Sequence, residues 1–326
     1  MAKTFNLATF TAFKNEDEAI ALLEKLRWPN GAACPHCGGA DPYKLTAKTT
    51  SKKPGRKGLW KCRACRKQFT VKVGTIFEQS HIPASKWLMA LHLQCSSKKG
   101  MSAHQFHRML GVTYRAAWFM AHRLRHAMSD TTLFPFPMSG VVEADETYIG
   151  GKRRQGSRKD GRTLLTGRPG PSDAIKTPVM ALVERKGRAI AFPVERVDGK
   201  TLQDAIRKHV RARATHMMTD DLKSYHGLSM GFAGHDTIKH STGEYVRENV
   251  HTNTVESFFA LLKRGIIGTF HHVSKGHLHR YCDEFAFRYT NRVALGVTDE
   301  DRTKLLVLAA EGKRLTYRQP SGTRAA

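Results

Sequence analysis

The sequence predicts a multidomain α/β protein, with two small N-terminal modules before a larger domain built on a mixed sheet flanked by helices. Three observations predict this organisation. Two Cys-x-x-Cys pairs lie in the first 65 residues, a helical pattern runs from Ile82 to about Met128, and strand patterns alternate with helices from Gly140 onward. A chain of 326 residues is long enough for about two domains and a small third module.

Basic residues dominate the composition and indicate the kind of partner. The chain has 54 Lys and Arg against 28 Asp and Glu, a formal net charge of +26 and a pI near 10.1. Because such an excess repels itself in a compact fold, it indicates a polyanion such as DNA and argues against an enzyme for a small neutral substrate. No stretch approaches 18 uninterrupted apolar residues, and the N-terminus lacks a continuous apolar segment. We therefore expect no membrane span, no signal peptide and a cytoplasmic location.

Four of the six cysteines form two closely spaced pairs, separated by 24 residues. They are Cys34, Cys37, Cys62 and Cys65. Two such pairs can bring four thiolates onto one Zn²⁺ ion, so residues 1–80 are predicted to form a zinc ribbon with one structural zinc. His36 lies inside the first pair and is expected to be a bystander, because four cysteines already complete the metal's coordination.

A basic stretch lies around and between these pairs. From Lys44 to Lys72 the chain has eleven Lys or Arg and no acid. Phe69, Val71 and Val73 alternate with polar residues, which predicts a half-buried strand. The ribbon is thus expected to present positive charge to phosphates. The alternative is a purely structural zinc site beside an incidental basic surface.

Residues 81–130 predict a helix-turn-helix module. Residues 102–110 and 113–126 have helical patterns, and Gly111 and Val112 form the short turn between them. The second helix should bury Ala117, Met120, Ala121 and Leu124. Its other side should face a DNA groove through Thr113, Tyr114, Arg115, His122 and Arg123. A helical hairpin that contacts no DNA remains the alternative.

The larger domain, residues 138–295, has an element order that identifies its fold. Strands are expected at 140–148, 177–184 and 188–194, then a helix at 200–211, strands at 215–221 and 235–240, and a helix from about Thr254. Acids interrupt the first strand, end the fourth, and lie on the last helix. That is the order of a ribonuclease-H-like fold, in which those three places meet at one edge of the sheet. Residues 296–326 are expected to form a C-terminal tail.

The three acids predicted to meet are Asp145, Asp220 and Glu256. Converging carboxylates repel one another, at about 4 kcal/mol for a close pair at an effective dielectric near 20, so such a cluster persists if it binds divalent cations. Oxygen ligands favour Mg²⁺ or Mn²⁺, and two such ions could act on a phosphodiester. Alternatives remain at each position: Glu143 or Glu146 for the first, Asp221 for the second, and for Glu256 a capping box that only closes a helix end.

Taken together, these motifs resemble the DDE transposases of prokaryotic insertion sequences, in the group with an N-terminal zinc ribbon. The matching segments are CPHC, CRAC followed by KQFTVKVGTIF, VVEADETYIGGK, MMTDDLKSY and HTNTVESFFALLKRGIIGTFHHVSKGHLHRYCDEFAFRYTNR. The resemblance implies that Asp145, Asp220 and Glu256 are the first, second and third metal ligands. It also implies that the ribbon and helix-turn-helix hold the element's terminal inverted repeats, on a homodimer or higher oligomer associated with the nucleoid.

The function implied is Mg²⁺-dependent hydrolysis at the element ends, then attack of the freed 3′-hydroxyl on target DNA. Lys263 and Arg264 are expected to contact phosphates near the metals. The basic loop beginning Lys152, Arg153 and Arg154 is expected to clamp DNA over the site. Two alternatives remain: a zinc-ribbon DNA-binding regulator without catalysis, and a related nuclease that cuts without joining.

Overall fold

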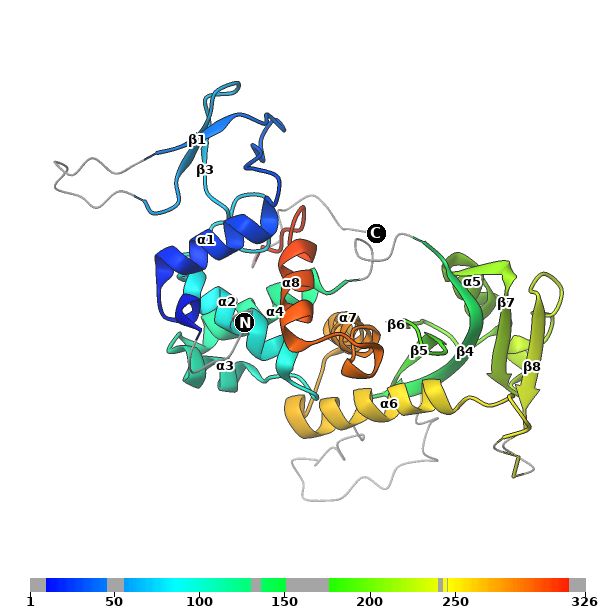
Figure 1. Ribbon diagram of the computed structural model, residues 1–326. Coiled ribbons are helices and arrows are strands. Elements are labelled where there is room, and N and C mark those ends of the chain that lie inside the picture. The colour runs from blue at the N-terminus through cyan, green and yellow to red at the C-terminus, as the bar shows by residue number, and fades with distance from the viewer. Residues whose placement is uncertain are drawn as a thin grey trace, which may run out of the picture. The chain divides into compact units, whose positions relative to one another are not determined.

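The structure is a computed structural model (Figure 1). It describes residues 10–45, 56–129, 136–150, 176–239, 243–244 and 246–316. These fall into two compact units. Unit 1 comprises Met1–Ser129 with Gly296–Ala326, and unit 2 comprises Asp130–Leu295. The predicted DNA clamp with Lys152, Arg153 and Arg154 lies outside the described residues.

Unit 1 begins with a short 3-10 turn, η1 (Thr11–Phe13), a helix and a small sheet. Helix α1 (Glu16–Arg27) starts at Asn15, whose side chain accepts hydrogen bonds from the N–H groups of Asp17 and Glu18. The three strands pair antiparallel in the order β1-β2-β3. They are β1 (Pro42–Lys44), β2 (Trp60–Cys62) and β3 (Gln68–Phe69). The predicted strand through Val73 therefore stops at Phe69, and a turn follows it.

The helices that follow confirm the predicted helix pattern in unit 1. They are α2 (Ala84–Ser96), α3 (Ala103–Leu110) and α4 (Tyr114–Ala127). Ser102 and Gln105 form a capping box at the start of α3, and Gly111 ends it at φ +58°, a left-handed conformation that glycine adopts without steric cost. Thr113 caps α4. The four residues expected to be buried on α4 are all buried.

The C-terminal segment is part of unit 1 rather than a separate tail. Helix α8 (Asp299–Ala309) packs against α1, α2 and α4. Arg302 Nε donates to the carbonyl of Cys95 over 3.0 Å, and Lys313 Nζ donates to the carbonyl of Ala127 over 2.9 Å. The boundary expected at 296 thus separates unit 2 from a returning segment that completes the core of unit 1.

Unit 2 is built on a five-stranded mixed sheet in the order β6-β5-β4-β7-β8. Strands β4 (Met138–Ile149), β5 (Thr177–Glu184) and β6 (Ala189–Pro193) pair antiparallel. Helix α5 (Gly199–His209) then leads to β7 (Val210–Asp220), which runs parallel to β4, and to β8 (Gly234–Ile238), parallel to β7. This is the predicted ribonuclease-H-like order.

Helices cover both faces of that sheet and bury two apolar cores (Figure 1). On one face Leu202 and Ile206 of α5 pack with Val142 and Ala144. On the other, helices α6 (Asn253–Gly265) and α7 (Leu278–Thr290) pack against alternate residues of β5. The expected apolar stripe of α6 lies in this second core. It consists of Val255, Phe258, Phe259, Leu262 and Ile266.

Sheet register brings two of the predicted acids toward one end of the sheet. Glu143 of β4 lies opposite Met218 of β7 in the parallel pair. The same register extended by two residues sets Asp145 opposite Asp220, with both side chains on the face covered by α6. Two acids that are 75 positions apart in the sequence are therefore neighbours in space.

Candidate functional site

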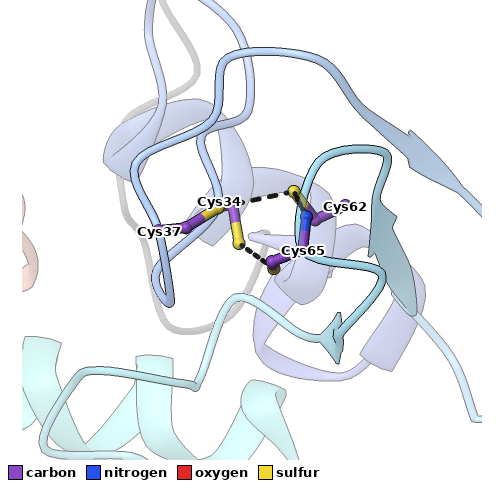
Figure 2. Close-up of side chains that lie close together, drawn as sticks. All are labelled: Cys34, Cys37, Cys62 and Cys65. Atoms are coloured by element: carbon purple, nitrogen blue, oxygen red, sulfur yellow. Dashed lines mark hydrogen bonds between the residues drawn. The ribbon is translucent and has the colours of Figure 1, made fainter.

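The four cysteines of unit 1 converge as a zinc site requires. Their sulfur atoms all lie within 4.8 Å of one another and point toward a common centre (Figure 2). The Sγ atoms of Cys34 and Cys65 are 3.7 Å apart, and those of Cys37 and Cys62 are 3.6 Å apart. Tetrahedral zinc with Zn–S bonds of about 2.3 Å sets sulfurs about 3.8 Å apart, so the cluster fits one Zn²⁺ ion.

The backbone around each cysteine pair supports this geometry. The residue after the second cysteine of each pair has a positive φ, +75° at Gly38 and +62° at Arg66. The Gly38 N–H donates to the Cys34 carbonyl and the Arg66 N–H to the Cys62 carbonyl. The N–H of Cys65 lowers the pKa of the Cys62 thiol to about 7, which favours the thiolate that binds metal. The four sulfurs are thus held by two similar turns, one in each cysteine pair.

His36 is exposed and does not belong to this cluster, as the sequence predicted. Its ring packs edge-on against Phe69, with 6.4 Å between centroids.

In unit 2 the structure brings together Asp145, Glu146 and Asp220, whose carboxylate oxygens lie within 4.8 Å of one another. Asp145 and Glu146 are consecutive on β4, so they leave the strand on opposite faces, and they meet Asp220 where β7 ends. Oxygens on opposite sides of an octahedral Mg²⁺ are about 4.2 Å apart. An all-oxygen donor set at this spacing fits a hard divalent cation such as Mg²⁺ or Mn²⁺.

The crowding of like charges perturbs the acids. Burial and the charges of Glu146, Asp220 and Glu256 together raise the pKa of Asp145 to about 7, against one hydrogen bond from the Glu146 N–H that lowers it. Burial also raises the pKa of Glu146, whereas the hydroxyl of Tyr225, 2.5 Å from its Oε2, lowers it. Without a cation, these surroundings disfavour the ionised forms of Asp145 and Glu146. A bound divalent cation would offset that cost, so the cluster favours binding one.

Glu256 lies on α6 near enough for its charge to raise the pKa of Asp145. Its carboxylate is exposed and is not among the three that lie within 4.8 Å; its Oε1 accepts a hydrogen bond of 2.9 Å from the hydroxyl of Thr252. The capping-box alternative fails, because Thr252 is the N-cap of α6 and its side chain caps no backbone N–H.

The alternative ligands differ in their environment. Asp221 is exposed and lies outside the carboxylate group, whereas Asp220 is in it and also accepts from the Leu222 N–H over 3.2 Å. Glu143 is fully buried and its oxygens are taken by Thr254, Val255 and Arg185. Glu146, predicted only as an alternative to Asp145, lies in the cluster beside it.

The residues expected to contact DNA divide into two groups. Arg115, Lys263 and Arg264 are exposed. His122 and Arg123 are buried, and the Arg123 guanidinium donates to the carbonyls of Ile76 and Glu78 over 2.8 and 3.0 Å. Because both side chains are buried, the expectation that they face a DNA groove is not met. Arg123 instead holds the 76–78 segment against α4.

Comparison with known proteins agrees with the fold and both clusters. Residues 137–290 match the family described as ISXO2-like transposase domain, and residues 14–68 match the transposase zinc-ribbon domain. The two matches together span about two thirds of the chain. The fold and the acidic cluster define a DDE-type enzyme with a ribonuclease-H-like domain. The chain belongs to the insertion-sequence transposases that carry an N-terminal zinc ribbon.

Individual relatives are more distant. The chain is 28% identical over 284 residues to an uncharacterized protein in transposable element ISH50 of Halobacterium salinarum, covering 85% of this chain and 91% of that protein. Among solved structures, the Mos1 transposase paired-end complex with the left transposon end gives a TM-score of 0.26 at 12% identity, over 73% of this chain and 82% of that one. A simian T-cell lymphotropic virus intasome gives 0.26 at 13%, over 56% and 67%. The fold assignment does not depend on these two similarities.

No helix in the described ranges is long and apolar enough to cross a bilayer.

Proposed function

We propose that this transposase binds the terminal inverted repeats of its insertion sequence and cuts and joins DNA with divalent cations held by Asp145, Asp220 and Glu256. The observation that carries the proposal is the meeting of Asp145, within β4, with Asp220, where the adjacent parallel strand β7 ends. Like charges brought together on a rigid sheet are favourable when a cation lies between them.

The reaction has two phosphoryl-transfer steps. In the first, water attacks the phosphorus at the element end and the bond to the 3′-oxygen breaks, so the element gains a 3′-hydroxyl and the flanking strand keeps the phosphate. In the second, that 3′-oxygen attacks a target phosphodiester and displaces the target's own 3′-oxygen. Two Mg²⁺ or Mn²⁺ ions, held by Asp145, Asp220 and Glu256, would supply Lewis-acid stabilisation of the charge that develops in both steps.

The chain's own residues position those groups. Asp145 and Asp220 are fixed by the register of β4 and β7, and Glu256 approaches from α6. Glu146 is oriented by the Tyr225 hydroxyl and adds negative charge beside Asp145. Tyr225 is itself fully buried in the core on the α5 face, so that support is rigid.

DNA is held by several basic surfaces in this proposal. The exposed Arg115 at the start of α4 would approach a groove, while Lys263 and Arg264 at the end of α6 would contact backbone phosphates. The net charge of +26 and the acid-free basic stretch of the ribbon support a large electrostatic contribution. Pairing two element ends would require a homodimer or higher oligomer, acting at the nucleoid.

The test uses the purified full chain and double-stranded DNA carrying the ends that flank its own gene. We expect the parent protein to nick these ends and join them to a second duplex with Mg²⁺ or Mn²⁺. Asp220→Asn should abolish both reactions and keep DNA binding. Asp221→Asn is the matched control, because it makes the same change at the adjacent, exposed acid, and it should retain activity.

Other outcomes separate the competing functions. Specific binding without nicking by the parent protein would support a regulator. Cutting without joining would support a nuclease.

A further inference from the structure

The buried carboxylate of Glu143 contacts the start of the helix that carries Glu256. Glu143 lies on β4, two residues before Asp145, and its side chain is 0% exposed. A buried carboxylate is costly unless every oxygen has partners. The identity of those partners shows what this residue does.

Some of these partners are backbone N–H groups in the first turn of α6. Glu143 Oε2 accepts from the N–H of Thr254 over 2.7 Å and from that of Val255 over 3.0 Å. Its Oε1 accepts from the Thr254 hydroxyl over 2.8 Å. These N–H groups are among the four that a helix start leaves without an intrahelical partner, and the N-cap side chain makes no capping bond here. A residue from the central strand therefore caps α6.

Arg185, just after β5, binds both Glu143 and the segment that precedes α6. Its Nε donates to Glu143 Oε1 over 2.7 Å. Its two terminal nitrogens donate to the carbonyls of Asn249 and His251 over 2.6 and 2.9 Å. The chain entering α6 is thus bound to the sheet by the carboxylate of Glu143 on β4 and by the guanidinium of Arg185 in the turn that follows β5.

We propose that Glu143 is a positioning residue that sets where Glu256 stands relative to Asp145 and Asp220. Glu256 directly follows Val255, whose N–H is bound by Glu143, so the bond fixes the backbone adjacent to the ligand. Glu143 and Asp145 lie on the same face of β4, so the residue that binds the start of α6 and the first proposed metal ligand belong to one rigid strand. The inference rests on the proposed function, in which Glu256 is the third ligand. Displacements near 1 Å are enough to disable such sites.

The test measures Mn²⁺ binding to the full-length protein without DNA, by calorimetry, so the readout does not depend on cleavage. Glu143→Gln keeps the side-chain volume but turns one acceptor into a donor that faces other donors. We expect it to weaken Mn²⁺ binding about 10-fold or more, the range seen when outer-sphere partners of metal ligands are lost. Glu184→Gln is the matched control. Glu184 also accepts two backbone N–H bonds on this sheet, from Ser139 and Arg188, and lies away from α6.

A double-mutant cycle decides whether Glu143 acts through Glu256. If it does, Glu143→Gln should cause no further loss in a Glu256→Gln background. An undiminished further loss, or parental Mn²⁺ binding by Glu143→Gln, overturns the inference. Zinc content and far-UV circular dichroism check folding. Thr254→Val removes the hydrogen bond from the Thr254 hydroxyl to Glu143 and keeps the side chain's shape. It should weaken Mn²⁺ binding about 5-fold, and it replaces Glu143→Gln in the test if that variant does not fold.

The cycle also separates the two proposals. If Glu256→Gln alone leaves Mn²⁺ binding and cleavage unchanged, the ligand assignment in the proposed function is wrong and the positioning role falls with it. If Glu256→Gln has its effect and neither Glu143→Gln nor Thr254→Val does, only the positioning role is wrong.

Discussion

Asp145→Asn is expected to stabilise unit 2 while abolishing its chemistry. In the unfolded chain the carboxyl of Asp145 ionises near its ordinary pKa of 3.8, whereas burial and its acidic neighbours raise that pKa to about 7 in the folded protein. The folded state alone therefore disfavours the charge. The substituted amide removes the charge, and its oxygen can still accept the bond of 2.8 Å from the Glu146 N–H.

The size and sign of the effect follow from that difference in pKa. Below about pH 3.8 the ionisation of Asp145 has no effect on the free energy of unfolding. As the pH rises, that free energy falls, by about 2 kcal/mol at pH 5 and about 4 kcal/mol above pH 7, where the loss is complete. The variant should therefore exceed the parent in unfolding free energy by more at pH 8 than at pH 5, with a difference of about 2–3 kcal/mol.

Urea unfolding in buffer without added Mg²⁺ or Mn²⁺ measures this, because the two units have separate probes. All four tryptophans lie in unit 1, at positions 28, 60, 87 and 118, so their fluorescence follows that unit and serves as an internal control. Far-UV circular dichroism follows both units. A circular-dichroism transition with no counterpart in the fluorescence therefore reports the unfolding of unit 2. At pH 8 its midpoint should lie at a higher urea concentration in the variant than in the parent. Adding Mn²⁺ should then stabilise the parent and not the variant.

A variant that is less stable than the parent by the same amount at both pH values would refute the reasoning. It would mean that Asp145 makes a structural contribution that outweighs its electrostatic cost.

Four further substitutions test other parts of the structure. Cys34→Ser should release the zinc and unfold unit 1, since a structural zinc contributes on the order of 10 kcal/mol; metal analysis and tryptophan fluorescence would detect it. Tyr225→Phe should lower the free energy of unfolding of unit 2 by about 1–3 kcal/mol at pH 8, measured in urea, because the carboxylate of Glu146 loses its hydroxyl partner. Arg123→Ala should destabilise unit 1 by about 2–3 kcal/mol with unchanged DNA affinity, whereas Arg115→Ala should leave stability intact and reduce the salt dependence of DNA binding by about one phosphate contact. If Arg123→Ala instead weakened DNA binding and left stability unchanged, Arg123 would belong to the DNA interface after all.

Local patterns predicted the elements of unit 2 closely. The strand expected at Thr177–Glu184 has those bounds, and the helix expected from Thr254 begins one residue earlier. Apolar periodicity is strong in both segments, because each packs one face on a core. The strand expected from Thr215 instead begins at Val210. Its first part pairs with β4 across an irregularity in the register near Gly140, which no local pattern reports.

The errors concern side chains whose partners are distant in the sequence. Helical periodicity placed Arg123 on the outer face of α4, but the 76–78 carbonyls that bind it lie 45 or more positions away. Glu143 was a reasonable candidate ligand, because a charge in an apolar strand needs an explanation. That explanation is the start of α6, 111 residues later. The sequence pattern showed that a partner must exist and could not identify it.

The orientation of Glu256 follows from the balance of charge at the site. At an effective dielectric near 20, bringing its carboxylate next to that of Asp145 costs about 4 kcal/mol per close pair, whereas the bond from Thr252 contributes about 1 kcal/mol. A divalent cation reverses the sign of the larger contribution, because each ligand then faces two positive charges. Asp145 and Asp220 are held together by the two paired strands regardless of that balance. In the proposed site, Glu256 would reach the metal by rotation of its side chain on α6. In the proposed site the paired strands therefore form the permanent part, and Glu256 would be the ligand whose engagement depends on the metal.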